Sequence, residues 1–131
     1  MRTLIQATAA ATLFGLFAIS MFSQNPGIQR TVVLKSDVSV PGREAVVARV
    51  ELAPGASAGR HTHAGEEITY VIEGEVEVLI DGQPAKKVKA GEAFLIPSGA
   101  VHDARNQGTV AVKMSGVYVV EKGKPLATPV N

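Results

Sequence analysis

Residues 55–74 read GASAGRHTHAGEEITYVIEG and contain two of the three histidines in the chain. His61 and His63 are separated by one residue, so on a β-strand both side chains leave from the same face, with their Cα atoms about 6.5 Å apart. Two imidazoles at that separation can converge on one metal ion at about 2.1 Å. Glu67 has the same parity as His63, and a tight turn or bulge at Gly65 would return its carboxylate to the same ion.

The neighbouring carboxylate, Glu66, has the opposite parity and should point away from this group. The third histidine, His102, follows the sequence PSGAV on a later predicted strand, and a barrel would bring such strands face to face. Taken singly, each histidine is more simply explained as an exposed turn residue or a satisfied, partly buried one. The glycines and prolines placed around all three favour a shared site instead.

These surrounding residues form two motifs with fixed spacing. The first contains, in order, Gly55, His61, His63, Glu67 and Gly74, and the second contains Gly91, Pro97, Gly99, His102 and Asn106. They match, at every specified position, the two signature motifs of the cupin superfamily, G(x)5HxH(x)3,4E(x)6G and G(x)5PxG(x)2H(x)3N. The chain as a whole resembles the stand-alone, single-domain, quercetin-dioxygenase-like (cupin type-2) proteins of bacteria, a label that does not establish quercetin as the substrate.

The resemblance implies an all-β fold, the cupin β-barrel, also described as a double-stranded β-helix or jelly roll. It also implies one divalent metal ion bound by His61, His63, Glu67 and His102. Fe or Mn is favoured for a three-His, one-Glu set, and Ni, Cu, Co or Zn is compatible with it. A pocket that holds no metal is the alternative. In some cupin dioxygenases the ligand glutamate also acts as a base, so Glu67 is the candidate catalytic residue, with pure ligation as the competing interpretation.

The fold alone does not decide the function, because cupins include oxygenases, decarboxylases, isomerases, sugar-binding domains and storage proteins. The favoured hypothesis is a metal-dependent enzyme of the dioxygenase or oxidase type that acts on a small oxygenated molecule. The alternative is a non-catalytic module that binds or senses a small ligand or a metal. Arg60, beside the histidines, is a candidate for recognising a carboxylate, although a solvated turn residue is the simpler interpretation. A homodimer is the expected assembly.

Composition excludes several other classes of protein. The 131 residues suit one domain, and a net charge of +1 with mixed signs gives no footprint for nucleic acid. The chain has no cysteine, which excludes disulfides, thiol catalysis and cysteine-bound metal. Any metal must therefore be held by nitrogen and oxygen atoms.

From Thr31 onward, short runs rich in Val, Ile and Leu are divided by Gly, Pro and Asp, without sustained helical periodicity. This pattern is typical of an all-β barrel or sandwich, here of about ten short strands. The dipeptide Asp81-Gly82 predicts a two-residue hairpin. Further turns or bulges are predicted at four glycines: Gly74, Gly91, Gly99 and Gly116.

Two segments carry additional expectations. The run ITYVI, residues 68–72, is apolar on both faces, so we expect a second cover over it, from another segment or from another subunit. The tail, residues 122–130, contains two prolines and predicts an extended arm outside the sheets.

The N-terminus, residues 1–23, is predicted to be an export signal. Between Arg2 and Arg30 the chain carries no charge, and the apolar run at 13–22 has the length of a secretory signal core. Small residues at the expected positions suggest cleavage before Met21. An uncleaved membrane anchor and a buried core helix are the alternatives.

We therefore expect a cupin domain at residues 24–131, with its barrel core at about 46–120. The domain should lie in the periplasm or be secreted, with membrane contact only through an uncleaved N-terminal segment. Its expected partners are a small-molecule substrate or ligand and a second copy of the chain.

Overall fold

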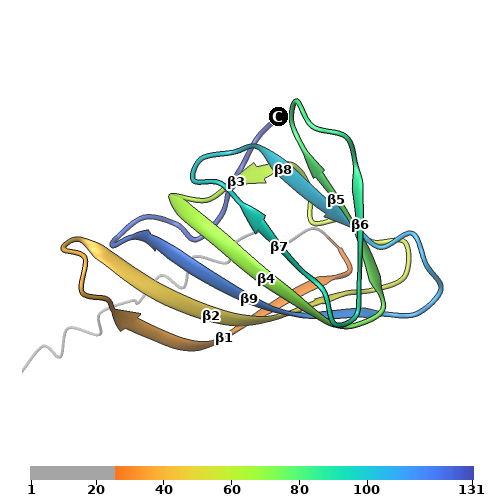
Figure 1. Cartoon of the computed structure of the whole chain (residues 1–131), viewed down its shortest axis with the longest axis horizontal. Coiled ribbons are helices and arrows are strands. Elements are labelled where there is room, and N and C mark those ends of the chain that lie inside the picture. Colours follow the sequence, from red (N-terminus) through yellow and green to blue (C-terminus); the bar gives the residue numbers. More distant parts are fainter. Residues whose placement is uncertain (1–25) are drawn as a thin grey trace, which may run out of the picture.

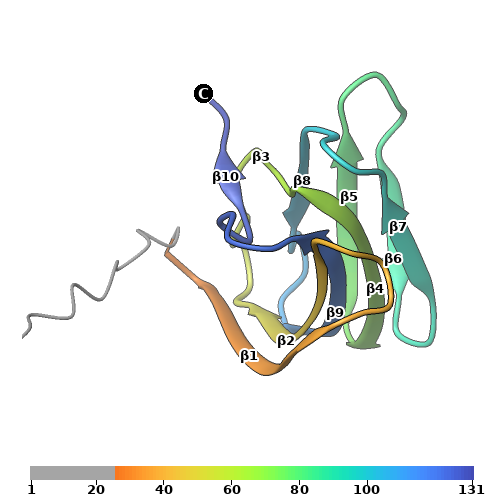
Figure 2. The ribbon, with the colours of Figure 1, turned by 90° about the vertical axis from the view of Figure 1, so that its left-hand side faces the viewer.

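The structure is a computed structural model of the whole chain, and it describes residues 26–131. These residues form ten β-strands and no helix. The strands are β1 (Ile28–Asp37), β2 (Arg43–Leu52), β3 (His61–Thr62), β4 (Gly65–Glu73), β5 (Glu75–Ile80), β6 (Lys86–Lys89), β7 (Ala93–Ile96), β8 (His102–Arg105), β9 (Val112–Glu121) and β10 (Thr128–Pro129). They pair into two five-stranded sheets, in the orders β1-β2-β9-β4-β7 and β10-β3-β8-β5-β6 (Figures 1 and 2). The predicted all-β, jelly-roll fold is confirmed.

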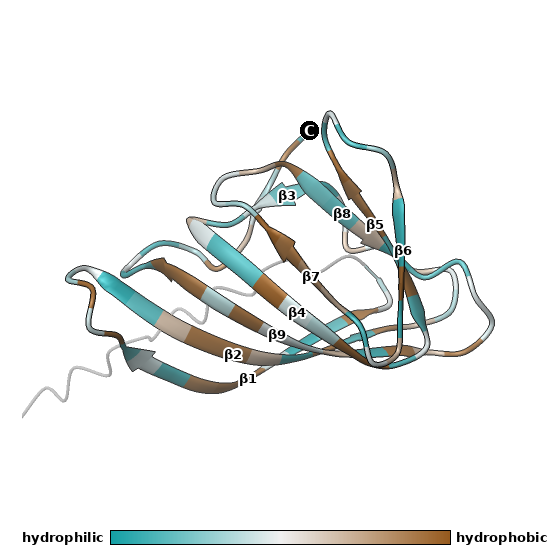
Figure 3. Ribbon diagram, viewed as in Figure 1, coloured by the Kyte–Doolittle hydropathy of each residue, from teal (hydrophilic) through white to brown (hydrophobic). Residues whose placement is uncertain are grey.

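Strict alternation places the core between the two sheets. In β4, every second residue from Gly65 to Val71 is buried, and the residues between them are exposed, as expected for side chains that leave alternate faces of a strand. Figure 3 shows that β4 carries both hydrophilic and hydrophobic residues, and their order along the strand does not follow this alternation of burial. The buried hydrophobic residues form one cluster, which is almost entirely aliphatic: Ile28, Val46, Ala48, Val50, Leu52, Val71, Val76, Val78, Val88, Phe94, Ile96, Val112, Met114, Tyr118 and Val120.

The connection between β5 and β6 corrects the predicted two-residue hairpin. The two strands do pair antiparallel, but β5 ends at Ile80 and β6 begins only at Lys86. Gly82 has a φ of 81°, and no residue other than glycine has a positive φ in the described part of the chain, whereas a type I′ turn needs it at both positions. The backbone N–H of Asp81 instead donates to Val101 O at 3.0 Å, which lengthens the loop.

The predicted glycine turns divide into two groups. Gly74, Gly91 and Gly99 have positive φ values and lie at chain reversals, as predicted. The prediction was wrong for Gly116, which lies inside β9. A Cβ atom there would come within 2.7 Å of the Tyr118 hydroxyl, so this glycine makes room for a buried ring.

The C-terminal arm also differs from the prediction. It was expected to lie outside the sheets, but Thr128 and Pro129 pair with β3 as the edge strand β10, and Val130 N donates to Arg60 O at 2.9 Å. A proline is tolerated at this position because an edge strand leaves one row of backbone groups unpaired. The arm therefore covers the strand that carries the first histidine.

The predicted export signal, residues 1–23, lies outside the described residues. Within residues 26–131, no helix has the length and hydrophobicity required to cross a membrane.

Candidate metal centre

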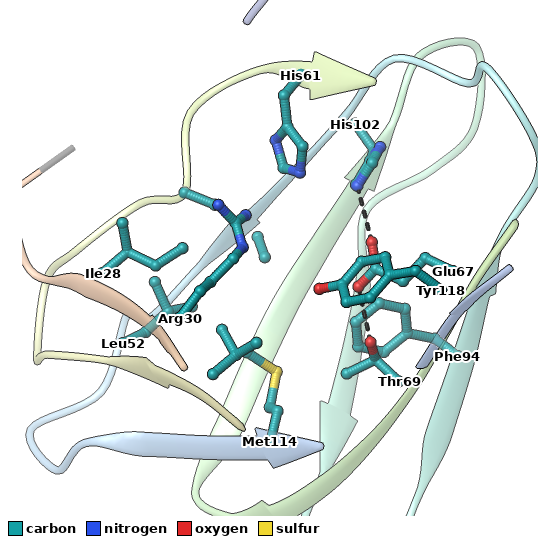
Figure 4. Close-up of a pocket in the computed structure, with 13 residues that line it drawn as sticks. Ile28, Arg30, Leu52, His61, Glu67, Thr69, Phe94, His102, Met114 and Tyr118 are labelled. Carbon is teal, nitrogen blue, oxygen red and sulfur yellow. Dashed lines mark hydrogen bonds and ion pairs between the residues drawn. The ribbon is translucent and has the colours of Figure 1, made fainter. Parts of the chain in front are cut away.

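The four predicted ligands come from both sheets and meet in the interior. His61 lies on β3, and His63 is the first residue after that strand. His102 is the first residue of β8, and Glu67 lies on β4 of the opposite sheet. All four are buried, and one potential ligand atom from each lies within 4.8 Å of those of the others. Figure 4 shows His61, His102 and Glu67 around a common space. The structure thus brings together the complete set expected from the two motifs.

Local backbone geometry explains this convergence. His61 and His102 are direct partners in the pairing of β3 with β8. After His63 the chain bends at Ala64 and enters the opposite sheet at Gly65, where a Cβ atom would collide with the backbone oxygen of Val119. Only glycine allows this close approach.

The parity argument for the two glutamates holds in the structure. Glu67 is buried and Glu66 is exposed, so only the former can join the group of histidines.

Each imidazole is oriented by a backbone carbonyl. Nδ1 of His61 donates to Gly59 O at 2.6 Å, Nδ1 of His102 donates to Ala100 O at 2.9 Å, and Nδ1 of His63 donates to Leu126 O. Because a carbonyl only accepts hydrogen bonds, Nδ1 carries a proton in each ring, and Nε2 is the nitrogen available to a ligand in the interior. Sequence reasoning missed all three carbonyls; the third belongs to the C-terminal arm.

The carboxylate of Glu67 faces Nε2 of His63 and of His102. Its Oε1 accepts a hydrogen bond from the Thr69 hydroxyl at 2.7 Å, while Oε2 lies 2.9 Å from His63 Nε2 and 3.2 Å from His102 Nε2. Burial acts to raise the pKa of Glu67, but the contacts with His102, His63 and Thr69 outweigh it and hold that pKa well below its usual range. Glu67 is therefore ionised at neutral pH.

This arrangement fits a metal ion. Two imidazole lone pairs and a carboxylate are all acceptors and cannot hydrogen-bond to one another, so a cation or a proton must lie between them. The Nε2 atom of His63 is buried and has no hydrogen-bond partner, which fits the role of a metal ligand. Burial is the main cause that lowers the pKa of His61 from 6.5 to about 4, which keeps this ring neutral and able to bind metal at neutral pH.

A small cavity of about 20 Å³ adjoins three of the four side chains, those of His61, Glu67 and His102. Apolar residues such as Leu52, Phe94 and Met114 form much of its wall, and its polar lining includes Arg30 beside three of the four candidate ligands (Figure 4). The cavity also contains Tyr118, whose pKa is raised by burial and by the charge of Glu67. The volume is little more than the space that holds one water molecule, about 10–15 Å³ by the same measure.

The structure does not place Arg60 in this cavity. Its guanidinium forms an exposed ion pair with Asp81, so the carboxylate-recognising role considered for it has no geometric basis. Sequence reasoning missed Arg30, because nothing in the local sequence connects it with the two motifs.

Two buried polar residues hold the segment that precedes His61. The Asn106 side chain donates to Leu52 O and Val110 O, at 3.0 and 2.8 Å, and accepts from Gly108 N at 2.9 Å. The backbone of Asn106 also accepts from Gly55 N and donates to Ala56 O, each at 2.9 Å, so this residue joins the two motifs. Asp103 accepts hydrogen bonds from the Ser57 hydroxyl at 2.8 to 2.9 Å. Parity alone would have placed Asp103 on an exposed face, opposite to His102, so sequence reasoning missed it.

Comparison with known proteins adds independent observations. A family model described as a Cupin domain matches residues 48–121. The chain is 33% identical over 88 residues to the oxalate-binding protein of Thermotoga maritima, a match that covers 66% of this chain and 72% of that protein. It is 40% identical over 67 residues to germin-like protein subfamily 2 member 2 of Arabidopsis thaliana, which covers 47% of this chain but only 31% of the plant protein.

The fold is similar to that of an oxalate oxidase solved in complex with the substrate analogue glycolate. The TM-score is 0.65 at 29% sequence identity, and the match covers 82% of this chain and 57% of the other. The chain therefore spans little more than half of the oxidase and less than a third of the germin-like relative.

Proposed function

This chain belongs to the cupin domain family, and from that premise we propose that it is a metal-dependent enzyme of the oxidase or dioxygenase type that acts on a small oxygenated molecule. The observation that carries the proposal is the buried group of His61, His63, Glu67 and His102, whose potential ligand atoms lie within 4.8 Å of one another and which adjoins a small cavity. Such a group, with room beside it for another molecule, suits a reactive metal site better than a purely structural one.

The four side chains would hold the metal through three neutral imidazoles and one carboxylate. When bound, an ion such as Fe(II) or Mn(II) would supply Lewis-acid and one-electron chemistry at this point of the cavity. The carbonyls behind the imidazoles keep the rings in position and set the tautomer, which is how residues behind metal ligands commonly act.

The geometry favours ligation over base catalysis for Glu67. Its Oε1 is already bound by Thr69 and its Oε2 faces two histidines, so no oxygen is left for a substrate proton. A carboxylate whose pKa is held well below its usual range is also a weak base. We therefore propose that Glu67 acts mainly as a ligand.

The remaining lining residues define what can enter. The side chains of Leu52, Phe94 and Met114 form an apolar part of the wall. Tyr118 remains protonated at neutral pH because its pKa is raised, so its hydroxyl can donate a hydrogen bond to a bound oxygen atom. A cavity of about 20 Å³ favours a molecule of a few atoms over one the size of quercetin, since sites for drug-sized ligands measure about 300–1,000 Å³. The names of two relatives refer to oxalate, and we propose small oxygenated acids as the first substrates to test.

A second candidate function is the binding of such a molecule without turnover. The occupied oxygens of Glu67 and the small cavity favour it, and the relative from Thermotoga maritima is named as a binding protein. The same metal group would then hold a ligand instead of activating it.

Metal content provides the first test. Protein purified without added metal and without a His-tag should contain about one equivalent of a divalent metal by elemental analysis. The substitutions His61→Ala, His63→Ala and His102→Ala should each remove it, while Arg60→Ala, outside the cavity, should retain it. A full equivalent in all three histidine variants would contradict the assignment.

Oxygen consumption separates the two candidate functions. Protein loaded with Fe(II) or Mn(II) should consume oxygen in an electrode cell when given one member of a panel of enols, diketones and small carboxylates, and the His63→Ala variant should not. Ligand binding without oxygen uptake across that panel would favour the non-catalytic module.

A further inference from the structure

Within residues 26–131, Arg30 is the one Lys or Arg side chain that lines the cavity. At the start of β1, Ile28 is buried, Gln29 is exposed and Arg30 is half-buried, so Ile28 and Arg30 share the inward face of the strand. Figure 4 shows the Arg30 side chain extending from β1 into the space below His61, with the Tyr118 hydroxyl directed towards it. Its guanidinium therefore shares the cavity with the candidate metal ligands.

The charge of Arg30 has no anionic partner within the part of the chain that the structure describes. The Nε atom is buried and makes no hydrogen bond, and none of the ion pairs among these residues includes Arg30. By contrast, Arg60 pairs with Asp81 and Arg105 pairs with Asp103. A partly buried guanidinium that lacks an anion destabilises the folded state, and a bound anion would offset this cost.

The charge balance of the cavity also favours an anionic ligand. Glu67 is the single carboxylate among its lining residues, and its oxygens are engaged by Thr69 and the histidines. With a divalent ion on the four ligands, Arg30 and the ion together would exceed the charge of Glu67 by about two units, since a histidine that binds a metal is neutral. A small mono- or dianion restores neutrality, whereas a neutral substrate does not.

We propose that Arg30 anchors a small carboxylate in this cavity and thereby selects an anionic substrate. The inference rests on the proposed function, because it assigns the substrate class of the same site. A guanidinium presents two parallel N–H groups that match the two oxygens of a carboxylate. The second end of the molecule would then face His61, His102 and Glu67.

Binding measurements on three proteins test the proposal. The wild-type chain is compared with Arg30→Met, which keeps the length of the side chain but removes its charge, and with Arg49→Met. Arg49 is a matched control. It lies on β2 next to Val50, the residue that pairs with Arg30, and its side chain is exposed on the outer face. Oxalate and its neutral diamide, oxamide, are titrated by calorimetry into metal-loaded and chelator-treated samples, and metal content is measured for each.

The expected result is that Arg30→Met binds oxalate about 10- to 100-fold more weakly than the wild type at unchanged metal content. Arg49→Met should bind oxalate as the wild type does, and oxamide should bind the wild type no better than it binds Arg30→Met. Equal oxalate affinity of the wild type and Arg30→Met, or no oxalate binding by any protein, overturns the proposal.

Two further arms keep this outcome separate from that of the proposed function. If Arg30→Met does not fold, the proposal is tested with Arg30→Lys and by comparing the affinity of the wild type for oxalate and for oxamide. Equal affinity of the wild type for the two ligands overturns the proposal. Oxalate binding that depends on Arg30 but is not followed by oxygen uptake supports the anchor while contradicting the enzyme. If no metal loads, the chelator-treated pair still shows whether oxalate binding requires Arg30.

Discussion

Proton positions on single residues decide what the site can bind. His61, His63 and His102 each donate an Nδ1 proton to a backbone carbonyl, which leaves Nε2 of each ring as the nitrogen available to a metal. The spacing of the histidines predicts that they share a face, but it does not predict which nitrogen faces the interior, because the carbonyls come from other parts of the chain.

The stability of metal-free protein should depend on pH through His61. Its pKa falls from 6.5 to about 4 on folding, mainly because of burial, so between these values the unfolded chain takes up a proton that the folded chain does not. The free energy of unfolding should therefore decrease as pH falls from about 6.5 to about 4, by at most about 3 kcal/mol. Urea unfolding of chelator-treated protein at several pH values measures this, and His61→Gln should remove that part of the slope.

Glu67 acts in the same direction at lower pH, because its depressed pKa makes the ionised form favourable in the folded state. A free energy of unfolding that stays constant from pH 7 to pH 4 in the metal-free wild type would show that His61 is not buried as a neutral ring.

Gly116 is a residue-scale constraint on the cavity wall. A Cβ atom at this position would lie 2.7 Å from the Tyr118 hydroxyl and 3.0 Å from its ring. Gly116→Ala should therefore displace Tyr118 and lower the free energy of unfolding by about 1–3 kcal/mol. Gly108→Ala is the control, because a Cβ there would meet only Asn106 Oδ1, at 3.4 Å. Thermal unfolding of both variants provides the measurement, and equal melting temperatures would contradict the prediction.

Among the structural elements, the segment between β2 and β3 is held against β8 by both side-chain and backbone contacts. Asp103 on β8 binds the Ser57 hydroxyl, Ser57 and Arg105 form an isolated bridge, and Ala58 N donates to Ala104 O at 2.9 Å. Since Gly59 O orients the imidazole of His61, these contacts place a metal ligand from a distance.

Loosening this segment should weaken metal binding without removing a ligand. Ser57→Ala removes the hydroxyl from Asp103, so His61 should be less well oriented and metal affinity should fall about 10-fold, the lower end of the range for residues behind metal ligands. Competition with a fluorescent chelator measures the affinity. Ser36→Ala is the control, since this exposed hydroxyl contacts only the backbone of its neighbour. The same metal affinity in both variants would show that the Asp103–Ser57 contact is purely structural.

At the scale of the whole molecule, the outer face of the sheet that contains β4 exposes several large hydrophobic side chains. Ile68, Tyr70 and Ile72 are 47%, 50% and 50% exposed, and Leu95, which pairs with Ile68 across β4 and β7, is 54% exposed. The sequence predicts a second cover for residues 68–72, and no other segment in the described part of the chain buries them.

We propose that a second copy of the chain covers this face. The two isoleucines flank Tyr70 symmetrically along β4, so a two-fold axis through Tyr70 would make the strip complementary to itself. The net charge of +1 also gives little repulsion between copies.

Light scattering should therefore give the mass of a dimer for the wild type, and Tyr70→Glu should shift it towards a monomer at micromolar concentration, because a charge at the centre of an apolar interface is costly. Val110→Glu is the control: Val110 is 65% exposed and lies outside β4 and β7, so this variant should remain dimeric. A monomeric wild type would contradict the assembly.

The sequence by itself was sufficient for the fold class, for the four members of the site and for the separation of Glu66 from Glu67. These properties depend on local periodicity and on motif spacing, which are written along the chain. The type of the β5–β6 turn was not predictable in this way, because Asp81 is held by Val101 and Arg60, which lie outside that hairpin.

Only the tertiary structure showed that Arg30, and not Arg60, lines the cavity, that Leu126 O orients His63, and that Asp103 is buried. Each of these depends on segments that are distant in sequence and meet only when the two sheets close and the C-terminal arm packs over β3. The ligands were visible in the sequence because two short motifs contain them; their surroundings were not, because they are assembled from the whole chain.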